Sequence, residues 1–136
     1  MPALKTFLMM AALMCVACRS TPKPVAKASR VVWRPIGSWT GHGNTQTDSF
    51  EMGNAEWRIK WDASHDTSPH GGTGTFKVEV HSAISGRPLI YAVDHRGVGH
   101  DIEYVTEDPR LFYLVIESQH LDWSIAVEES VVMDAK

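Results

Sequence analysis

Cysteine is absent from most of this chain. The two cysteines, Cys15 and Cys18, lie near the N-terminus, and residues 19–136 contain none. The rest of the chain therefore has neither an internal disulfide nor a cysteine-ligated metal. A folded region of about a hundred residues buries roughly two-thirds of its unfolded surface and requires neither. The sequence predicts one domain that is stabilised by its own hydrophobic core.

Basic residues are also scarce in the body of the chain, from Val31 to Lys136. Five of the 13 Lys and Arg precede it, so 8 remain there against all 16 Asp and Glu, a net charge of −8. The five are Lys5, Arg19, Lys23, Lys27 and Arg30. Phosphate groups repel a surface this acidic, and we therefore expect no binding to nucleic acid.

No helical period of useful length follows the first residues. Apolar and polar residues instead alternate in short runs separated by turn residues, which is typical of half-buried strands. The inward-facing residues are predicted to be Trp57, Ile59 and Trp61, then Phe76, Val78 and Val80, and finally Leu121, Trp123, Ile125 and Val127. About eight short strands of this kind predict an all-β fold, an antiparallel β-sandwich, with a small β-barrel as the alternative.

The stretch 111–128 is predicted to lie at the centre of this fold. Residues 111–116 are apolar on both faces, so we expect them to be covered on both sides. Residues 121–128 alternate, and the polar residues 117–120 are expected to join the two strands as a hairpin.

Other boundaries follow from turn and breaker residues. Val31–Trp33 are expected to form a short first strand that is stopped by Pro35. We expect a loop over His95–Asp101, because this segment contains two glycines. The residues after Glu129 are expected to form a short, frayed tail.

Residues 1–17 have the features of a signal peptide. Lys5 precedes an uncharged apolar run from Phe7 to Ala17, which is too short to span a bilayer. Cys18 follows, and the sequence then becomes polar. An apolar core, a small residue and then cysteine resemble the lipobox of bacterial lipoproteins, although Cys15 stands where that family most often has Leu. An ordinary secretory signal with two incidental cysteines is the alternative.

The lipobox resemblance implies cleavage before Cys18 and acylation of that cysteine. The protein would then be anchored through lipid to a membrane of the bacterial cell envelope, facing the periplasm or the cell surface. Residues 18–30 carry several cations and two prolines and have no apolar period, so we expect a tether there. The β-sandwich domain is predicted over residues 31–136.

A second resemblance covers most of this domain. The residues that carry it are, in order, Trp39, Gly41-His42-Gly43, Phe50, Trp57-Arg58-Ile59-Lys60-Trp61, Phe76-Lys77-Val78, Gly97-Val98-Gly99, Phe112-Tyr113-Leu114 and Trp123-Ser124-Ile125. This order is similar to that of small extracytoplasmic β-sandwich domains in bacterial lipoproteins and surface proteins. Because that group is mostly uncharacterised, the resemblance implies fold and location and transfers no site residue.

The histidines are the first candidates for chemistry. They are His42, His65, His70, His81, His95, His100 and His120, and most fall in predicted loops or turns. Imidazole with carboxylate suits zinc or copper, so the candidate metal ligands are His65, Asp66, His70, His95 and His100. Their spacings match no known metal motif, and solvent-facing loop histidines are the alternative.

The five tryptophans are candidates for a binding surface. Trp57, Trp61 and Trp123 are in phase with aliphatic core positions, so we assign them to the core. Trp33 and Trp39 lie in less regular sequence, and we predict that they contribute to a partner-binding site.

Motifs for catalysis are absent from the sequence. Ser64-His65-Asp66 are adjacent and cannot adopt the geometry of a triad together. No Gly-x-Ser-x-Gly elbow is present, and the glycine-rich segments lack a following helix that would cradle phosphate. We therefore expect no enzyme activity. The predicted function is a non-catalytic binding or structural module for an envelope protein or glycan, with periplasmic metal binding through loop histidines as the alternative.

Overall fold

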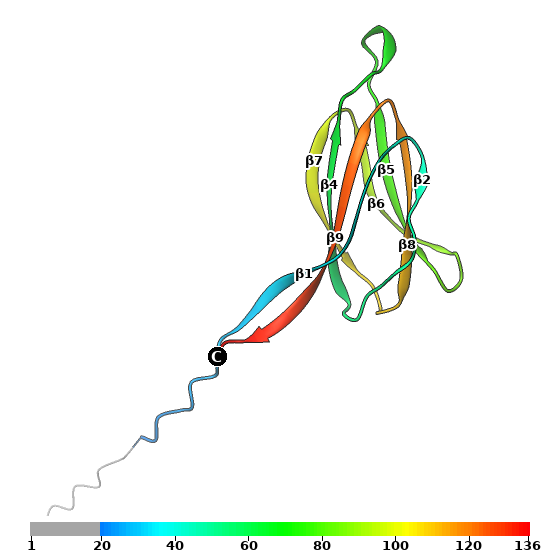
Figure 1. The fold of residues 1–136 in the computed structure, drawn as a ribbon. Coiled ribbons are helices and arrows are strands. Elements are labelled where there is room, and N and C mark those ends of the chain that lie inside the picture. The colour runs from blue at the N-terminus through cyan, green and yellow to red at the C-terminus, as the bar shows by residue number, and fades with distance from the viewer. Residues whose placement is uncertain (1–19) are drawn as a thin grey trace, which may run out of the picture.

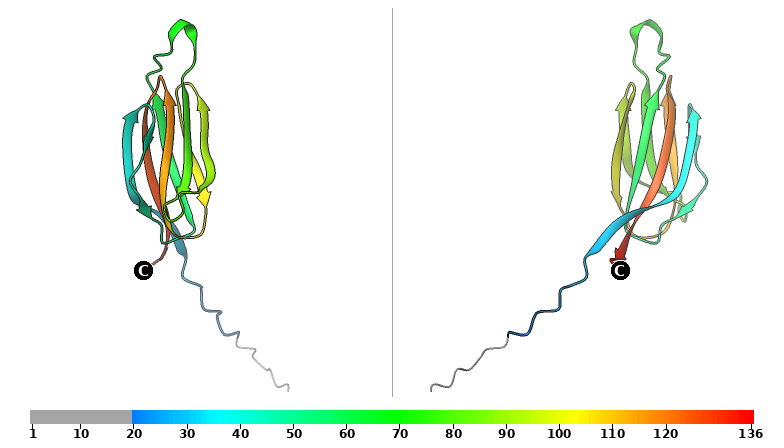
Figure 2. Two further views of the ribbon diagram at one scale, coloured as in Figure 1. Left: turned by 90° about the vertical axis from the view of Figure 1, so that its right-hand side faces the viewer. Right: turned by 60° about the vertical axis from the view of Figure 1, so that its left-hand side comes forward.

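The computed structural model describes residues 20–136, so the predicted signal peptide and Cys18 lie outside the described residues. The described chain forms two antiparallel sheets that face each other, and it contains no α-helix. The sandwich is elongated, and the chain enters it at one end (Figure 1, Figure 2). The prediction of an all-β sandwich is confirmed, and the two sheets do not close into the alternative barrel.

The nine strands of residues 20–136 are divided between the two sheets. The strands are β1 (Ser29–His42), β2 (Thr45–Gln46), β3 (Phe50–Glu51), β4 (Glu56–Ser64), β5 (Thr75–Ser82), β6 (Pro88–Arg96), β7 (Gly99–Thr106), β8 (Leu111–Gln119) and β9 (Asp122–Asp134). The four-stranded sheet has the order β1-β9-β4-β7. In the five-stranded sheet, β8 pairs with β5 and with the short strands β2 and β3, and β6 forms the far edge. A short 3₁₀ helix, η1 (Pro69–Gly71), lies in the loop after β4.

The hydrophobic core lies between the inner faces of the two sheets. The inward-facing residues predicted on β4, on β5 and on β9, with Leu121 just before β9, are all buried. This confirms the period of two. Aromatic rings fill much of this space. Trp57 packs against Phe112 with ring centroids 5.2 Å apart, and Trp61 packs against Phe76 at 5.5 Å. The assignment of Trp57, Trp61 and Trp123 to the core is confirmed.

The predicted hairpin over residues 111–128 is wrong. β8 belongs to the five-stranded sheet and β9 to the four-stranded sheet, so the link at His120 crosses from one sheet to the other. Both strands alternate because each has one face against the core. Alternation therefore identified the inward faces but did not reveal which strands pair.

The expectation that residues 111–116 are covered on both faces is also wrong. Phe112, Leu114 and Ile116 are fully buried, whereas Leu111 is exposed and the residues between them are half-buried. The outer face of β8 carries apolar residues without a layer above it among the described residues. Antiparallel sheets tolerate this, because one face can remain in contact with water.

Pro35 does not stop the first strand. β1 continues through it, and the pairing with β9 shifts between Pro35 and Gly37, where Ile36 is the extra residue of a bulge. β1 is an edge strand that pairs with β9 alone, so a residue without an N–H is tolerated there. The bulge also changes which side chains face the core. Trp33 lies opposite Ser130 on the outer face, whereas Trp39 lies opposite buried Ile125 on the inner face.

Two further boundaries differ from the expectation. The residues after Glu129 are not a frayed tail, because β9 continues to Asp134 and pairs with β1 from Ser29 onward. The loop expected over His95–Asp101 is reduced to residues 97–98, since β6 ends at Arg96 and β7 begins at Gly99. Because β1 begins to pair at Ser29, the paired strands start two residues before the predicted start of the domain at Val31.

A buried carboxylate ties the tether-side end of the sandwich together. The Glu129 side chain is fully buried and accepts hydrogen bonds from the Arg34 guanidinium and from the backbone N–H groups of Gly53 and Asn54, both at 2.6 Å. These donors come from β1 and from the turn that precedes β4. Burial raises the pKa of the Glu129 carboxyl, but the hydrogen bonds and the charge of Arg34 outweigh it, so the pKa lies below its ordinary value.

We expect Glu129→Gln to destabilise the fold by about 1–3 kcal/mol, because the amide faces donors that were arranged for a carboxylate. The lowered pKa stabilises the folded state above about pH 4.5, the ordinary value, and this contribution is lost as the pH falls through the folded pKa. Denaturant unfolding of both proteins from pH 7 downward should therefore show their stabilities converging in acid. Glu56→Gln, at an exposed position on β4, is the control and should change stability little at any pH. A constant gap between wild type and Glu129→Gln would contradict this assignment.

Candidate functional site

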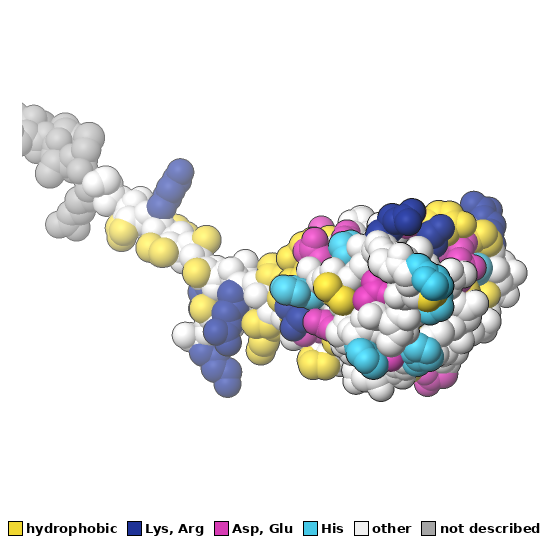
Figure 3. Space-filling view, turned by 90° about the horizontal axis from the view of Figure 1, so that it is seen from above, with side chains coloured by type: hydrophobic (Ala, Val, Ile, Leu, Met, Phe, Trp, Pro, Cys, Tyr) yellow, Lys and Arg dark blue, Asp and Glu magenta, His cyan; other side chains and the backbone are white. Residues whose placement is uncertain are grey.

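Six of the seven histidines gather at one end of the sandwich, opposite the end where the tether enters. They are His42 at the end of β1, His65 and His70 in the loop after β4, His95 near the end of β6, His100 near the start of β7 and His120 between β8 and β9. We call this the histidine-rich end. Figure 3 looks down on it, and histidine side chains are spread across the surface. The strand directions place them together, although they are far apart in the sequence.

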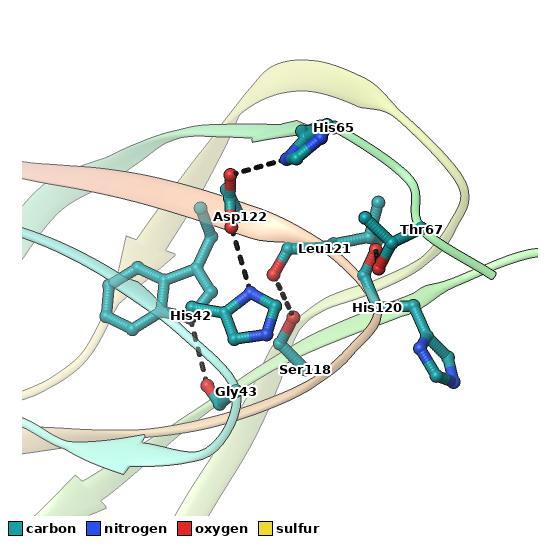
Figure 4. A network of polar contacts seen from close by, with 9 residues as sticks. His42, Gly43, His65, Thr67, Ser118, His120, Leu121 and Asp122 are labelled. Carbon is teal, nitrogen blue, oxygen red and sulfur yellow. Dashed lines mark hydrogen bonds and ion pairs between the residues drawn. The ribbon is translucent and has the colours of Figure 1, made fainter.

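Asp122, the first residue of β9, holds two of these histidines. Its Oδ1 lies 2.9 Å from Nδ1 of His42, and its Oδ2 lies 3.1 Å from Nδ1 of His65 (Figure 4). His42 is the direct partner of Asp122 in the β1–β9 register, and β4 lies on the other side of β9 with Ser64 opposite Asp122. One carboxylate therefore links the ends of β1 and β4 across β9.

These contacts change the acidity of Asp122. Hydrogen bonds from His42 and then His65 lower the pKa of the Asp122 carboxyl below its ordinary value, against a smaller opposing effect of burial. Because the Nδ1 atoms of both imidazoles are engaged, their Nε2 atoms are the nitrogens left for a ligand. This is the arrangement in which a carboxylate fixes the orientation of a histidine for binding through its other nitrogen.

Backbone conformation sets the same end apart. In residues 20–136, the non-glycine residues with positive φ are all histidines of this end: His65 (φ 53°), His70 (φ 56°) and His120 (φ 62°). The left-handed region is uncommon for any residue except glycine, although histidine is among the types found there more often. Backbone of this kind gathers at functional sites more often than elsewhere. The conformation therefore supports the histidine-rich end as a site.

Asp66 has a structural role in the loop that carries these histidines. Its carboxylate accepts hydrogen bonds from the backbone N–H of Ser68 at 2.9 Å and from that of Gly74 at 2.8 Å. Hydrogen bonding by Ser68 is the largest cause that lowers the pKa of Asp66, and the bond from Gly74 adds to it. Asp66 thus closes the base of the loop from within, and its carboxylate is not directed at a shared metal position.

The predicted metal ligands do not converge. His65 is held by Asp122, Asp66 by its own loop, and His95 packs its ring 4.9 Å from that of Trp61. His70 is exposed on η1, and His100 lies on the outer face of β7. Across residues 20–136, no group of three or more His, Cys, Asp or Glu side chains is placed to hold a metal ion. The five-residue metal site stays a prediction that this geometry does not support.

A shallow groove of about 680 Å³ crosses the outer face of the four-stranded sheet. Two rows of side chains, each with one residue from every strand, form its floor and sides. The rows are Thr40–Ser124–Asp62–His100 and Ser38–Ala126–Lys60–Ile102. Small side chains on β1 and β9 leave the hollow, and longer ones on β4 and β7, all polar except Ile102, border it. The groove offers hydroxyl, carboxylate, ammonium and imidazole groups along one side of an open surface.

The row of residues on the tether side of the groove contains an ion pair. Arg58 Nε lies 2.5 Å from a carboxylate oxygen of Glu128, and both side chains are largely buried. The Arg58 guanidinium also lies over the ring of Trp33, 4.2 Å from the ring centroid, and Tyr104 packs against the same tryptophan. These two contacts leave Trp33 half-buried where the ribbon joins the sheet.

Of the two tryptophans predicted for partner binding, Trp39 is among the residues that line the groove and Trp33 is not. Trp33 is half-buried beside the groove, whereas Trp39 packs against Phe50 at 5.6 Å and donates from Nε1 to Asp48. Sequence reasoning missed Asp122 as the residue that organises the histidines. Only the β1–β9 register, which alternation does not predict, brings Asp122 beside His42.

The adjacent residues His65 and Asp66 have separate hydrogen-bond partners, and so does the last histidine. In the segment Ser64-His65-Asp66, His65 bonds to Asp122 and Asp66 bonds to the loop backbone, so the adjacent residues do not act together. The seventh histidine, His81, lies at the tether-side end, where its ring stacks on Tyr113 and its Nδ1 lies 3.1 Å from the Gly86 carbonyl oxygen.

No protein-family model matches the sequence, and a search of curated proteins finds none that matches. Within residues 20–136, no helix is long and apolar enough to cross a membrane.

Proposed function

We propose that this protein is a lipid-anchored component of the bacterial cell envelope and that its β-sandwich is a non-catalytic binding module. The anchor is Cys18, which lies outside the described residues, and the proposal for it rests on the lipobox-like sequence. Residues 20–28 lead from that position to the start of β1. The binding surface is the histidine-rich end together with the groove beside it.

The observation that carries the proposal is the groove and its position. Its volume of about 680 Å³ is within the range of small-ligand sites. It lies on the outer face of the four-stranded sheet, where two complete rows of side chains are available to a partner. The tether leaves from the other end of the molecule, so an anchored protein keeps this surface accessible (Figure 1).

The lining of the groove is mainly apolar and carries a few polar groups, a combination that suits an envelope protein or a glycan. Its hydroxyl groups, carboxylate and ammonium group can form hydrogen bonds with the polar groups that recur along a glycan or a polypeptide. The domain is acidic, and this excludes strong binding to nucleic acid on electrostatic grounds.

Periplasmic metal binding is the second candidate. It is favoured by the gathering of six histidines at one end and by the engagement of both His42 and His65 through Nδ1, which leaves Nε2 for zinc or copper. The metal would be held by exposed imidazoles at this end, among them His42 and one of the five residues expected from the sequence, His65.

The groove is tested by immobilising this protein and capturing a partner from envelope extract. Ala126→Arg fills the hollow and should abolish capture, because Ala126 lies in the middle of one row. Thr106→Arg, on the same face of β7 but outside the groove, is the matched control and should capture as wild type does. Equal capture by both variants, or no enrichment by wild type, would count against the proposal.

The anchor is tested separately by Cys18→Ser. We expect this change to abolish metabolic labelling of the protein with radioactive palmitate and to release it from the membrane fraction. Cys15→Ser is the control and should leave labelling intact. Labelling that persists in Cys18→Ser would show that Cys18 is not the acylated residue.

The metal alternative predicts a thermal shift. Zinc or copper at a hundredfold excess over its dissociation constant should stabilise residues 29–136 by about 2.7 kcal/mol, which raises the Tm by several degrees. His42→Ala and His65→Ala should remove the shift, whereas His81→Ala, at the opposite end, should retain it. A Tm that is the same in chelator and in each metal would eliminate this alternative.

A further inference from the structure

A two-stranded ribbon extends from the sandwich at the end where the tether enters. Residues 29–33 of β1 pair with residues 130–134 of β9, and the pairing of β9 with β4 does not reach beyond Glu129. The ribbon therefore has no third strand among the described residues, and it projects from the body (Figure 1). Two strands alone are marginally stable in water.

The ribbon is apolar although it is exposed. Val31 and Val132 are direct cross-strand partners on the same face as Trp33, and they are 57% and 66% exposed. Met133 is 48% exposed on the other face. Figure 3 shows hydrophobic side chains gathered along the chain that leaves the body and at its junction with the body. Apolar surface of this extent on a projecting element indicates that something covers it.

Other exposed apolar residues lie toward the same end. Ile84 is in the loop between β5 and β6, Leu111 begins β8, and Tyr104 is near the end of β7. At the histidine-rich end, the large hydrophobic residue that is exposed among residues 20–136 is Val98. The molecule therefore has one polar, histidine-rich end and one end with an apolar surface.

Charge distinguishes the tether from the body. The first 47 residues contain no Asp or Glu, and all 16 acidic residues follow. Lys23 and Lys27 lie in the tether and Arg30 in the ribbon, whose other strand carries one acidic residue, Asp134. Anionic lipid head groups attract juxtamembrane cations and repel an acidic body, so the ribbon is the part that can approach a membrane closely.

The length of the tether makes this approach feasible. Residues 19–28 separate Cys18 from the first residue of β1, a distance of about 35 Å at full extension and about 18 Å on average for a flexible chain of ten residues. A lipid-anchored Cys18 thus keeps the ribbon close to the head groups. Apolar side chains flanked by cations are the combination that binds at a membrane interface.

We propose that the ribbon, with the cations that precede it, rests on the anionic lipid surface to which the chain is anchored. This inference depends on the proposed lipid anchor and adds a second, non-covalent contact to it. Val31, Val132 and Trp33 enter the interface from one face of the ribbon, and Lys27 and Arg30 meet the head groups. The histidine-rich end, at the other end of the sandwich, then points away from the membrane.

Trp33 provides a natural reporter. The full chain, acylated in a bacterial host, is reconstituted into vesicles of phosphatidylethanolamine and phosphatidylglycerol whose acyl chains carry bromine. Bromine quenches a tryptophan that enters the interface, whereas Trp57, Trp61 and Trp123 are buried in the sandwich. We expect quenching in wild type and its loss in Trp33→Phe. Flotation of the vesicles reports the lipid anchor independently.

The matched pair of variants is Val132→Asp and Val98→Asp. Both valines are exposed to a similar extent, but they lie at opposite ends. Val132→Asp should lose the quenching while still floating with the vesicles, and Val98→Asp should behave as wild type. Vesicles of phosphatidylcholine alone should give weaker quenching, and equal quenching would overturn the assignment to anionic lipid.

The outcomes separate the two proposals. Flotation of wild type without quenching, or equal quenching in Val132→Asp and wild type, would overturn the membrane contact and leave the lipid anchor standing. Failure of wild type to float would overturn the anchor and, with it, this contact. Circular dichroism of both valine variants checks that the sandwich is intact in each.

Discussion

The buried carboxylate of Glu129 is the interaction on which the tether-side end of the molecule depends. A fully buried charge is costly unless its partners satisfy it, and here the Arg34 guanidinium and two backbone N–H groups do so. Those partners belong to β1 and to the turn before β4. The carboxylate therefore fixes where β1 leaves the sandwich and begins the ribbon. It also fixes the position of Gly53 and Asn54, the turn through which the chain crosses from β3 in one sheet to β4 in the other.

β9 connects this buried charge to the opposite end. Its inner face carries Trp123, Ile125 and Val127 into the core, and Glu129 continues the same face beyond them. Its first residue, Asp122, holds His42 and His65, which lie at the ends of its two neighbouring strands. One strand therefore contributes a carboxylate at each end of the sandwich. The carboxylate at the tether-side end is buried and structural, and the one at the histidine-rich end is half-exposed and orients two histidines.

The sequence was informative about faces and uninformative about neighbours. The period of two identified which side chains of β4, β5 and β9 enter the core, because burial on one face imposes that period on any strand. It gave no information on pairing, so β8 and β9 were joined as a hairpin although they lie in different sheets. The bulge at Ile36 was likewise not predictable from alternation. Pro35 indicated an irregularity but not that β1 continues past it, and the faces of Trp33 and Trp39 depend on that bulge. Histidine composition indicated a site, but the arrangement around Asp122 follows from register alone.

The orientation of the groove relative to the ribbon is fixed because β1 and β9 pair over almost their whole length. They are in register from Ser29 and Asp134 at the ribbon to His42 and Asp122 at the histidine-rich end, and the groove lies over the middle of the same two strands. A contact that orients the ribbon therefore orients the groove, because no flexible segment separates them. A tether alone restricts how far the domain moves but leaves it free to turn. A ribbon that rests on the membrane, as proposed, would restrict rotation as well, and the domain would then lose less rotational freedom when its histidine-rich end binds a partner.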